Sequence, residues 1–315
     1  MFINEIVFLS QRIWKVYWAL LKVMVPAIVL VKILDSLGAS SYLSIALSPL
    51  MEFVGLPAEF GIVWATSILV NLYTGMAIYF SLTLSDSISV AQITILASMM
   101  LVAHGLPVES AISKSVGLSW IYTIALRLLG ALALGFILHV LFNTFSLLQE
   151  PSQLLWKPEQ QDDSILAWCV IQLKTLILAL VIIVMLIISM RLLEVMGIEK
   201  FIHYLLNPFL KLIGIGKEAA NITVIGVTLG LSFGGGLLIE QAKDGEVSKR
   251  NVFLSMSFLC LCHSLIEDTL LMVLLGADLV SILIGRLLFT FIVMAIMAHI
   301  IFHKTKGMDL EKFFK

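Results

Sequence analysis

Charged side chains are scarce in this 315-residue sequence. Asp, Glu, Lys and Arg make up 13% of it and hydrophobic residues 60%, whereas soluble domains contain about 25% charged and roughly 45–50% apolar residues. So little charge excludes an ordinary soluble domain. The net charge of −1 gives no support for a nucleic-acid partner, and we expect none.

Cysteine and the motifs of soluble enzymes are also lacking. The three cysteines, Cys169, Cys260 and Cys262, lie inside apolar stretches and suggest no disulfide framework. The sequence contains no Gly-x-Ser-x-Gly, no His-Glu-x-x-His and no phosphate-binding loop. We therefore expect no enzymatic activity, no catalytic residues and no cofactor. Nucleotide hydrolysis therefore has no support in the sequence.

Long apolar runs recur along the whole sequence, for example Val23–Val31, Leu176–Met190 and Leu287–Ala298. With their flanks, several reach the roughly 20 residues that a membrane-spanning helix needs, and about six to ten such segments fit. The sequence therefore predicts an all-α polytopic membrane protein whose main partner is the lipid bilayer.

The chain repeats itself after 159 residues. This shift pairs His104 with His263, Arg127 with Arg286, and Glu109 with Asp268. Because His and Arg are scarce here, these coincidences indicate a tandem repeat. We predict a first repeat at 1–145, a polar extracytoplasmic linker at 146–164 and a second repeat at 165–315.

Each repeat is expected to contain five elements: a long span, an amphipathic interfacial segment, an apolar segment interrupted by small residues, a segment broken around a His, and a last span. In the first repeat they fall at about 16–36, 40–54, 59–82, 88–112 and 117–143. In the second they fall at about 165–192, 199–213, 219–242, 248–275 and 279–303.

Three consecutive glycines, Gly234–Gly236, stand in the middle of an apolar run, where each costs a helix roughly 1 kcal/mol. Unpaired backbone groups are tolerated at membrane depth only inside protein or a polar cavity. We predict a re-entrant hairpin with unwound backbone at these glycines. An uninterrupted helix through them, or a His263 far from His104, would contradict the arrangement of two inverted units around a polar hollow. An odd number of true crossings remains in each half, so the second half is inverted relative to the first.

The basic residues support inverted halves. With the N-terminus inside, this arrangement places most of them inside, leaving Lys157 clearly outside and Lys32 near the outer end of the first span. Parallel halves would move Lys114 and Lys217 outside. The positive-inside rule therefore favours inverted repeats with both termini in the cytoplasm.

Ionisable residues in apolar segments are candidate functional groups, because each costs about 2.5–3.5 kcal/mol to insert. On a continuous helix, His263 and Glu267 would share a face, and the acid would orient the imidazole. In the first half, Gly105 and Pro107 should break the helix after His104. Each half thus has a His followed five residues later by an acid, Glu109 or Asp268.

Each candidate also has a structural interpretation. His263 could donate an interhelical hydrogen bond, Glu267 and Asp268 could cap a helix, and Glu240 could be solvated. The glycines could permit close helix packing. Cys260 and Cys262 are expected to be packing residues. Arg127 and Arg286 could form ion pairs with buried acidic side chains.

The stretch Gly230–Ala277 resembles a known family. Its segments Leu231-Ser-Phe-Gly-Gly-Gly236 and Cys262-His-Ser-Leu-Ile-Glu-Asp-Thr269 are similar to the Gate, or nucleoside recognition, domain. Spore maturation membrane proteins, the membrane core of the bacterial ferrous-iron transporter and concentrative nucleoside transporters share this domain. The resemblance implies two inverted Gate repeats with re-entrant hairpins, broken helices and interfacial amphipathic helices.

Carried over by position, the resemblance assigns substrate binding to the hairpin tip and to the second broken element. The tip residues are Ser232, Phe233, Gly234, Gly235 and Gly236, and the broken element supplies His263, Ser264, Glu267 and Asp268. In the first half, Asn71–Gly75, with Thr74 and Gly75, stands in the place of Gly230–Gly234. The tip lacks the Cys and Pro of the iron transporters and the polar motifs of the nucleoside transporters. The resemblance therefore does not identify the substrate.

We therefore predict a gradient-driven secondary transporter of a small polar solute, with a nucleoside-like organic solute slightly favoured over a divalent cation. Glu240, His104 and Glu109 complete the predicted substrate site. If the cargo or coupling ion is a cation, His263, Glu267 and Asp268 are its ligands. H⁺ or Na⁺ is the expected coupling ion, and a homodimer is possible. The alternatives are a non-transporting membrane assembly or maturation factor of the Gate type and an intramembrane hydrolase using His263.

Overall fold

The computed structural model describes residues 2–37, 39–82, 88–152, 164–243, 245, 247–301 and 313–314. Within these residues the chain is helical, without β-strands apart from one isolated bridge between Ser89 and Pro151. Five helical stretches are long and apolar enough to cross a membrane: Ile13–Leu30, Val90–Ser115, Trp120–Thr144, Ile165–Ser189 and Ser281–His299. The prediction of an all-α membrane protein is confirmed. Residues 153–163 of the predicted linker, with Lys157, lie outside the described part.

The helices of the two halves follow the same order. The first half contains α1 (Phe2–Ser36), α2 (Ala39–Phe53), α3 (Phe60–Leu69), α4 (Leu72–Ser81), α5 (Val90–Val102), α6 (Leu106–Ser115) and α7 (Trp120–Thr144). The second contains α8 (Ile165–Val195), α9 (Ile198–Leu212), α10 (Lys217–Leu229), α11 (Leu231–Lys243), α12 (Lys249–Leu261), α13 (Glu267–Leu274), the π-helical turn η1 (Ser281–Gly285) and α14 (Arg286–His299). The bounds of α2 and α9, and of α5 and α12, coincide after a shift of 159 residues.

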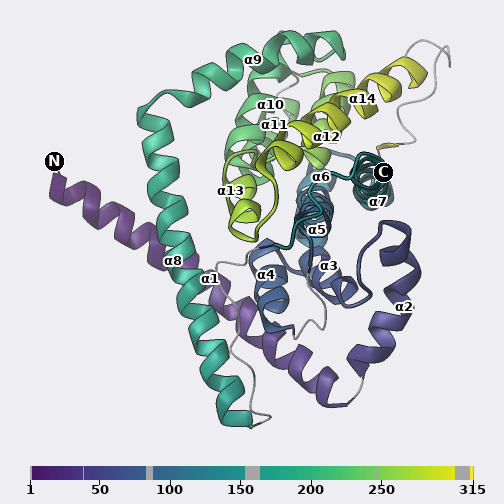
Figure 1. Cartoon of the computed structure of the whole chain (residues 1–315). Coiled ribbons are helices and arrows are strands. Elements are labelled where there is room, and N and C mark those ends of the chain that lie inside the picture. The colour runs from purple at the N-terminus through teal and green to yellow at the C-terminus, as the bar shows by residue number, and fades with distance from the viewer. Residues whose placement is uncertain are drawn as a thin grey trace.

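The two long helices α1 and α8 cross each other (Figure 1). At the crossing, the Tyr17 hydroxyl donates a hydrogen bond to the Leu176 carbonyl at 3.1 Å. Leu176 stands 159 residues after Tyr17, so each of these residues contacts its own counterpart in the other half.

Each half contains a helical hairpin, α3–α4 and α10–α11, which turns at equivalent positions. The first hairpin turns at Asn71, whose side-chain oxygen accepts a hydrogen bond from Thr74 N at 2.9 Å and so caps α4. The second turns at Gly230, where φ is +97°, a conformation that favours glycine.

The prediction that the backbone unwinds at Gly234–Gly236 is wrong. Helix α11 runs through all three glycines, and the break lies earlier, at Gly230. A Cβ atom on Gly234 would lie 2.3 Å from the Cα atom of Gly226 in α10. The two helices therefore touch backbone to backbone, which requires glycine and offsets its low helix propensity.

Each half also contains a broken helix. One consists of α5 and α6, which stop and restart around His104, and the other of α12 and α13 around His263. Gly105 and Ser264 hold equivalent positions in the breaks, and both adopt left-handed backbone with φ of +53° and +47°. The break after His104 was predicted from Gly105 and Pro107, and the structure confirms it.

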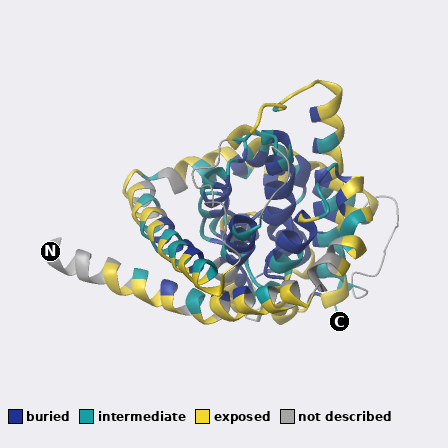
Figure 2. Cartoon of the chain, turned by 60° about the horizontal axis from the view of Figure 1, so that its bottom comes forward, coloured by how far each residue is buried: buried dark blue, intermediate teal, exposed yellow. Residues whose placement is uncertain are grey.

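The broken helices and hairpins form the buried centre, and the long helices surround them (Figure 2). Of the candidate spans, Val90–Ser115 is 83% buried, whereas the others are 14–35% buried. Large apolar side chains such as Leu30, Ile177 and Ile292 are exposed on the long helices, as contact with lipid requires.

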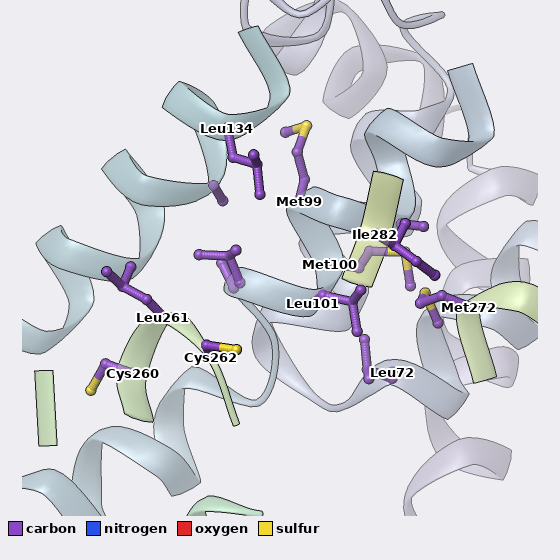
Figure 3. Close-up of a cluster of buried hydrophobic side chains, with 14 of the residues drawn as sticks. Leu72, Met99, Met100, Leu101, Leu134, Cys260, Leu261, Cys262, Met272 and Ile282 are labelled. Carbon is purple, nitrogen blue, oxygen red and sulfur yellow. The ribbon is translucent and has the colours of Figure 1, made fainter. Parts of the chain in front are cut away.

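Apolar side chains of both halves pack together in the centre. Leu72, Met100 and Leu101 come from the first half and Met272 and Ile282 from the second, and they form one buried cluster (Figure 3). Cys260 and Cys262 are fully buried in the same core. This placement agrees with the expectation that they are packing residues.

Candidate functional site

A pocket of about 260 Å³, lined by both polar and apolar side chains, opens where the two helix breaks meet the two hairpin turns. Its lining consists of Asn71–Tyr73, Leu229–Leu231, His104, Glu109, His263, Ser264 and Asp268. Both halves contribute a His and an acid. The pocket is therefore built jointly by positions that correspond in the repeat.

The two imidazoles are held in the same way. His104 Nδ1 lies 2.8 Å from the Met100 carbonyl oxygen, and His263 Nδ1 lies 2.7 Å from that of Leu259. A carbonyl oxygen only accepts hydrogen bonds, so we assign the proton of each neutral ring to Nδ1. Each Nε2 then presents its lone pair to the pocket. These two Nε2 atoms lie 3.3 Å apart.

Two carboxylates approach the imidazole pair. Glu109 Oε1 lies 3.2 Å from His104 Nε2 and 3.4 Å from His263 Nε2. The other oxygen of Glu109 pairs with the Arg127 guanidinium, which orients the carboxylate toward the histidines. Asp268 Oδ2 lies 3.7 Å from His104 Nε2. This buried oxygen accepts no hydrogen bond from the described residues.

The buried arginines satisfy the ends of the broken helices. Arg127 Nε donates to the Val102 carbonyl at 2.8 Å, and its counterpart Arg286 donates to that of Leu261 at 3.1 Å. Arg286 Nη2 also donates to the His263 carbonyl at 2.8 Å. The last carbonyls of a helix have no partner within the helix, and none can come from lipid. The arginines thus stabilise the breaks that carry the histidines.

Five predicted site residues are brought together: His104, Glu109, His263, Ser264 and Asp268 line the same pocket. An ion-binding site needs such convergence. One ligand atom each of His104, His263 and Asp268 lies within 4.8 Å of the other two.

Glu267 does not join them. The predicted pairing of His263 with Glu267 on one helical face is wrong, because α12 ends at Leu261 and α13 begins at Glu267. Glu267 Oε1 instead accepts a hydrogen bond from the Tyr73 hydroxyl at 3.1 Å. This hydrogen bond therefore links the turn of the first hairpin to α13 beside the pocket.

The three glycines of the predicted tip do not line the pocket. Gly234 and Gly235 face Gly226 and Ile112, while Gly236 is exposed and a Cβ atom added to it would meet open space. Glu240 is exposed near the end of α11. The backbone of Ser232 and Phe233 belongs to α11, and their side chains lie outside the described part. Gly234 and Gly235 serve helix packing instead, and the turn occurs at Gly230.

In the first half, Thr74 and Gly75 support the hairpin in the same way. The Thr74 hydroxyl donates to Asn71 Oδ1 at 3.0 Å, and a Cβ atom on Gly75 would lie 2.9 Å from that of Ser67. The shift of 159 residues carries Ser67 and Gly75 onto Gly226 and Gly234. The same close helix contact thus recurs in both hairpins.

Asn71, Tyr73 and Gly230 are pocket residues that the sequence analysis did not single out for a role there. The shift of 159 residues pairs Asn71 with Gly230, and both can end one helix and begin another. That coincidence is the signal from which both turns could have been located. Nothing in the sequence marks Tyr73 before the fold brings it to Glu267.

Comparison with known proteins supports membrane location. The chain is 29% identical over 286 residues to an uncharacterized membrane protein, YvoD, of Bacillus subtilis (strain 168), and the match covers 90% of each chain. No family model matches the sequence, and no solved structure matches the fold. The chain is a membrane protein with several helices suited to span the bilayer.

Proposed function

We propose that this protein is a gradient-driven secondary transporter of a small polar solute, built from two inverted Gate-like repeats. The main observation in support is the pocket, in which an imidazole and an acid from each half meet at interrupted helices. Ionisable groups buried at membrane depth are costly and mark substrate or ion pathways. Transporter sites commonly form between repeats, where discontinuous helices expose their ends.

Two contacts support a two-fold relation between the halves. His104 meets His263, and Tyr17 meets Leu176, and each pair joins residues 159 positions apart. An axis through both contacts exchanges the halves. Together with the distribution of basic residues, this favours an axis in the membrane plane, inverted repeats and cytoplasmic termini in a bacterial inner membrane.

The pocket volume favours a small cargo. Pockets for drug-sized ligands usually measure about 300–1,000 Å³, and this one measures about 260 Å³. The sequence slightly favours a nucleoside-like solute over a divalent cation. The convergence of two imidazoles with two acids in the pocket reverses that preference.

Access to the pocket from both sides tests the transport proposal. Ser264→Cys places a thiol in the pocket, after the exposed Cys169 has been replaced by Ser. We expect a membrane-impermeant maleimide to label this variant in both right-side-out and inside-out vesicles, because a transporter exposes its site alternately. Ile292→Cys, on an exposed apolar position of α14, is the lipid-facing control and should stay unlabelled.

Labelling from one side alone, under every imposed gradient, would overturn transport and favour the assembly-factor alternative. Flux of divalent cations and nucleosides into proteoliposomes completes the test. A transporter moves at least one of these solutes, and an assembly factor moves none.

A further inference from the structure

The pair of imidazole lone pairs defines a site for a positively charged ion. Both Nδ1 atoms are committed to carbonyl oxygens, so both Nε2 atoms act as acceptors in the neutral rings. Two such acceptors 3.3 Å apart repel each other unless a proton or a metal ion lies between them. Arg127 does not fill this role, because its guanidinium is bound to the far oxygen of Glu109 and to a backbone carbonyl.

The distances match the ligand shell of a divalent transition-metal ion. Two ligand atoms about 2.0–2.1 Å from a tetrahedral metal lie about 3.3 Å apart. His104 Nε2, His263 Nε2 and Glu109 Oε1 form a triangle with sides of 3.3, 3.2 and 3.4 Å. They therefore fit one face of a tetrahedron. Asp268 is a further ligand beside them: its unpartnered Oδ2 lies 3.7 Å from His104 Nε2, and Asp268 groups with both histidines within 4.8 Å.

The surroundings of these atoms are those of a metal site. A metal-binding His commonly donates its other N–H to a carbonyl or carboxylate, which fixes the ring and raises the basicity of the ligand atom. Both histidines do so here. Glu109 is likewise oriented by Arg127, so that one oxygen remains directed at the histidines.

We infer that His104, His263, Glu109 and Asp268 bind a divalent transition-metal ion, and, if the proposed transport function holds, that this ion is the cargo. Two imidazoles and two carboxylates suit Zn²⁺, Fe²⁺, Co²⁺ or Mn²⁺, whereas Ca²⁺ and Mg²⁺ prefer oxygen ligands alone. Thiolates take no part, because neither Cys260 nor Cys262 belongs to the converging group of ligand atoms, and both are fully buried in the apolar core.

Binding of Co²⁺ to the purified full-length protein tests the site directly. The chelator-treated protein is titrated with Co²⁺, and the visible d–d absorption of the bound ion is recorded. We expect one ion per chain, with the intense absorption of a four-coordinate site, and displacement by Zn²⁺. His104→Asn, His263→Asn and Asp268→Asn should each weaken binding by at least about 100-fold, since loss of an outer-shell partner alone costs about 10–100-fold.

His203→Asn is the matched control. His203 bonds Asn221 at 2.7 Å outside the pocket, so its replacement should leave the Co²⁺ affinity unchanged. Wild-type protein without four-coordinate absorption overturns the inference, as does a loss of affinity equal in His203→Asn and His263→Asn. Should the site variants not fold, the wild-type titration alone decides.

Flux separates this inference from the transport proposal. If the protein binds the metal but proteoliposomes do not transport it, the cargo role is overturned and the metal site still stands. If the protein transports an organic solute but binds no Co²⁺, the metal site is overturned and the transport proposal still stands. Zn²⁺ uptake by wild-type protein, lost in Asp268→Asn, supports both.

Discussion

The Nε2 atoms of His104 and His263 lie 3.3 Å apart, although 159 residues separate them in the sequence. Each ring is anchored through Nδ1 to the carbonyl four residues before it. The pair is thus preorganised by two equivalent local structures, one from each half. Such rigidity is what a binding site needs, because little conformational freedom is lost when the ion binds.

Neighbouring acids on α13 should differ sharply in function. Asp268 faces His104, whereas Glu267 accepts a hydrogen bond from Tyr73. We predict that Asp268→Asn abolishes high-affinity Co²⁺ binding, while Glu267→Gln changes the affinity by less than about threefold, because it removes no ligand. Isothermal titration calorimetry of both variants measures the difference. Equal losses would show that the two carboxylates act together and that the assigned ligand set is wrong.

Loss of Arg127 should destabilise the fold through Glu109. Arg127→Met leaves a buried carboxylate without its cation, which costs roughly 3–5 kcal/mol of unfolding free energy. The double variant Arg127→Met/Glu109→Gln removes the uncompensated charge and should recover part of that loss. Denaturant unfolding in detergent micelles compares the two. If the double variant is no more stable than the single one, the ion pair is not the cause.

The glycines of α11 should respond differently to added side chains. Gly234→Val drives a side chain into the backbone of α10 at Gly226 and should cost at least about 1–3 kcal/mol. A Cβ atom on Gly236 would have no neighbour within 4 Å, so Gly236→Ala should raise helix stability by up to about 1 kcal/mol. Melting temperatures of the purified variants measure both. A stable Gly234→Val protein would rule out the backbone contact.

Equivalent residues should face opposite sides of the membrane. Glu59 and Glu218 are exposed and correspond after the shift of 159 residues. Inverted repeats predict that Glu59→Cys reacts with an impermeant maleimide only from outside and Glu218→Cys only from inside. Parallel repeats predict reaction from the same side, so vesicles of the two orientations decide between the arrangements.

Much of the helical order could be predicted from the sequence. The coincidence of His, Arg and acidic residues after 159 positions identified four of the residues that meet in the pocket, because these scarce residues stand out in an apolar chain. Gly105 and Pro107 located the break after His104. The membrane character followed from the same low charge content. These are local or periodic properties, which a single sequence carries.

The errors came from contacts between helices. Glycine propensity predicted unwinding at Gly234–Gly236, but the contact with Gly226 needs a smooth helix and decides the conformation. Helix α12 ends at Leu261, where Arg286 binds the backbone carbonyls of Leu261 and His263. Glu267 therefore does not share a helical face with His263. A side chain 25 residues away in the sequence makes that contact, and no local pattern indicates it.

X-ray absorption spectroscopy of the Zn²⁺-loaded protein tests the central claim most directly, because it identifies the atoms around the ion. The ligand set predicts four nitrogen or oxygen neighbours at about 2.0–2.1 Å, with outer scattering from two imidazole rings and none from sulfur at about 2.3 Å. A shell containing sulfur, or one without imidazole scattering, would contradict a site built on His104 and His263.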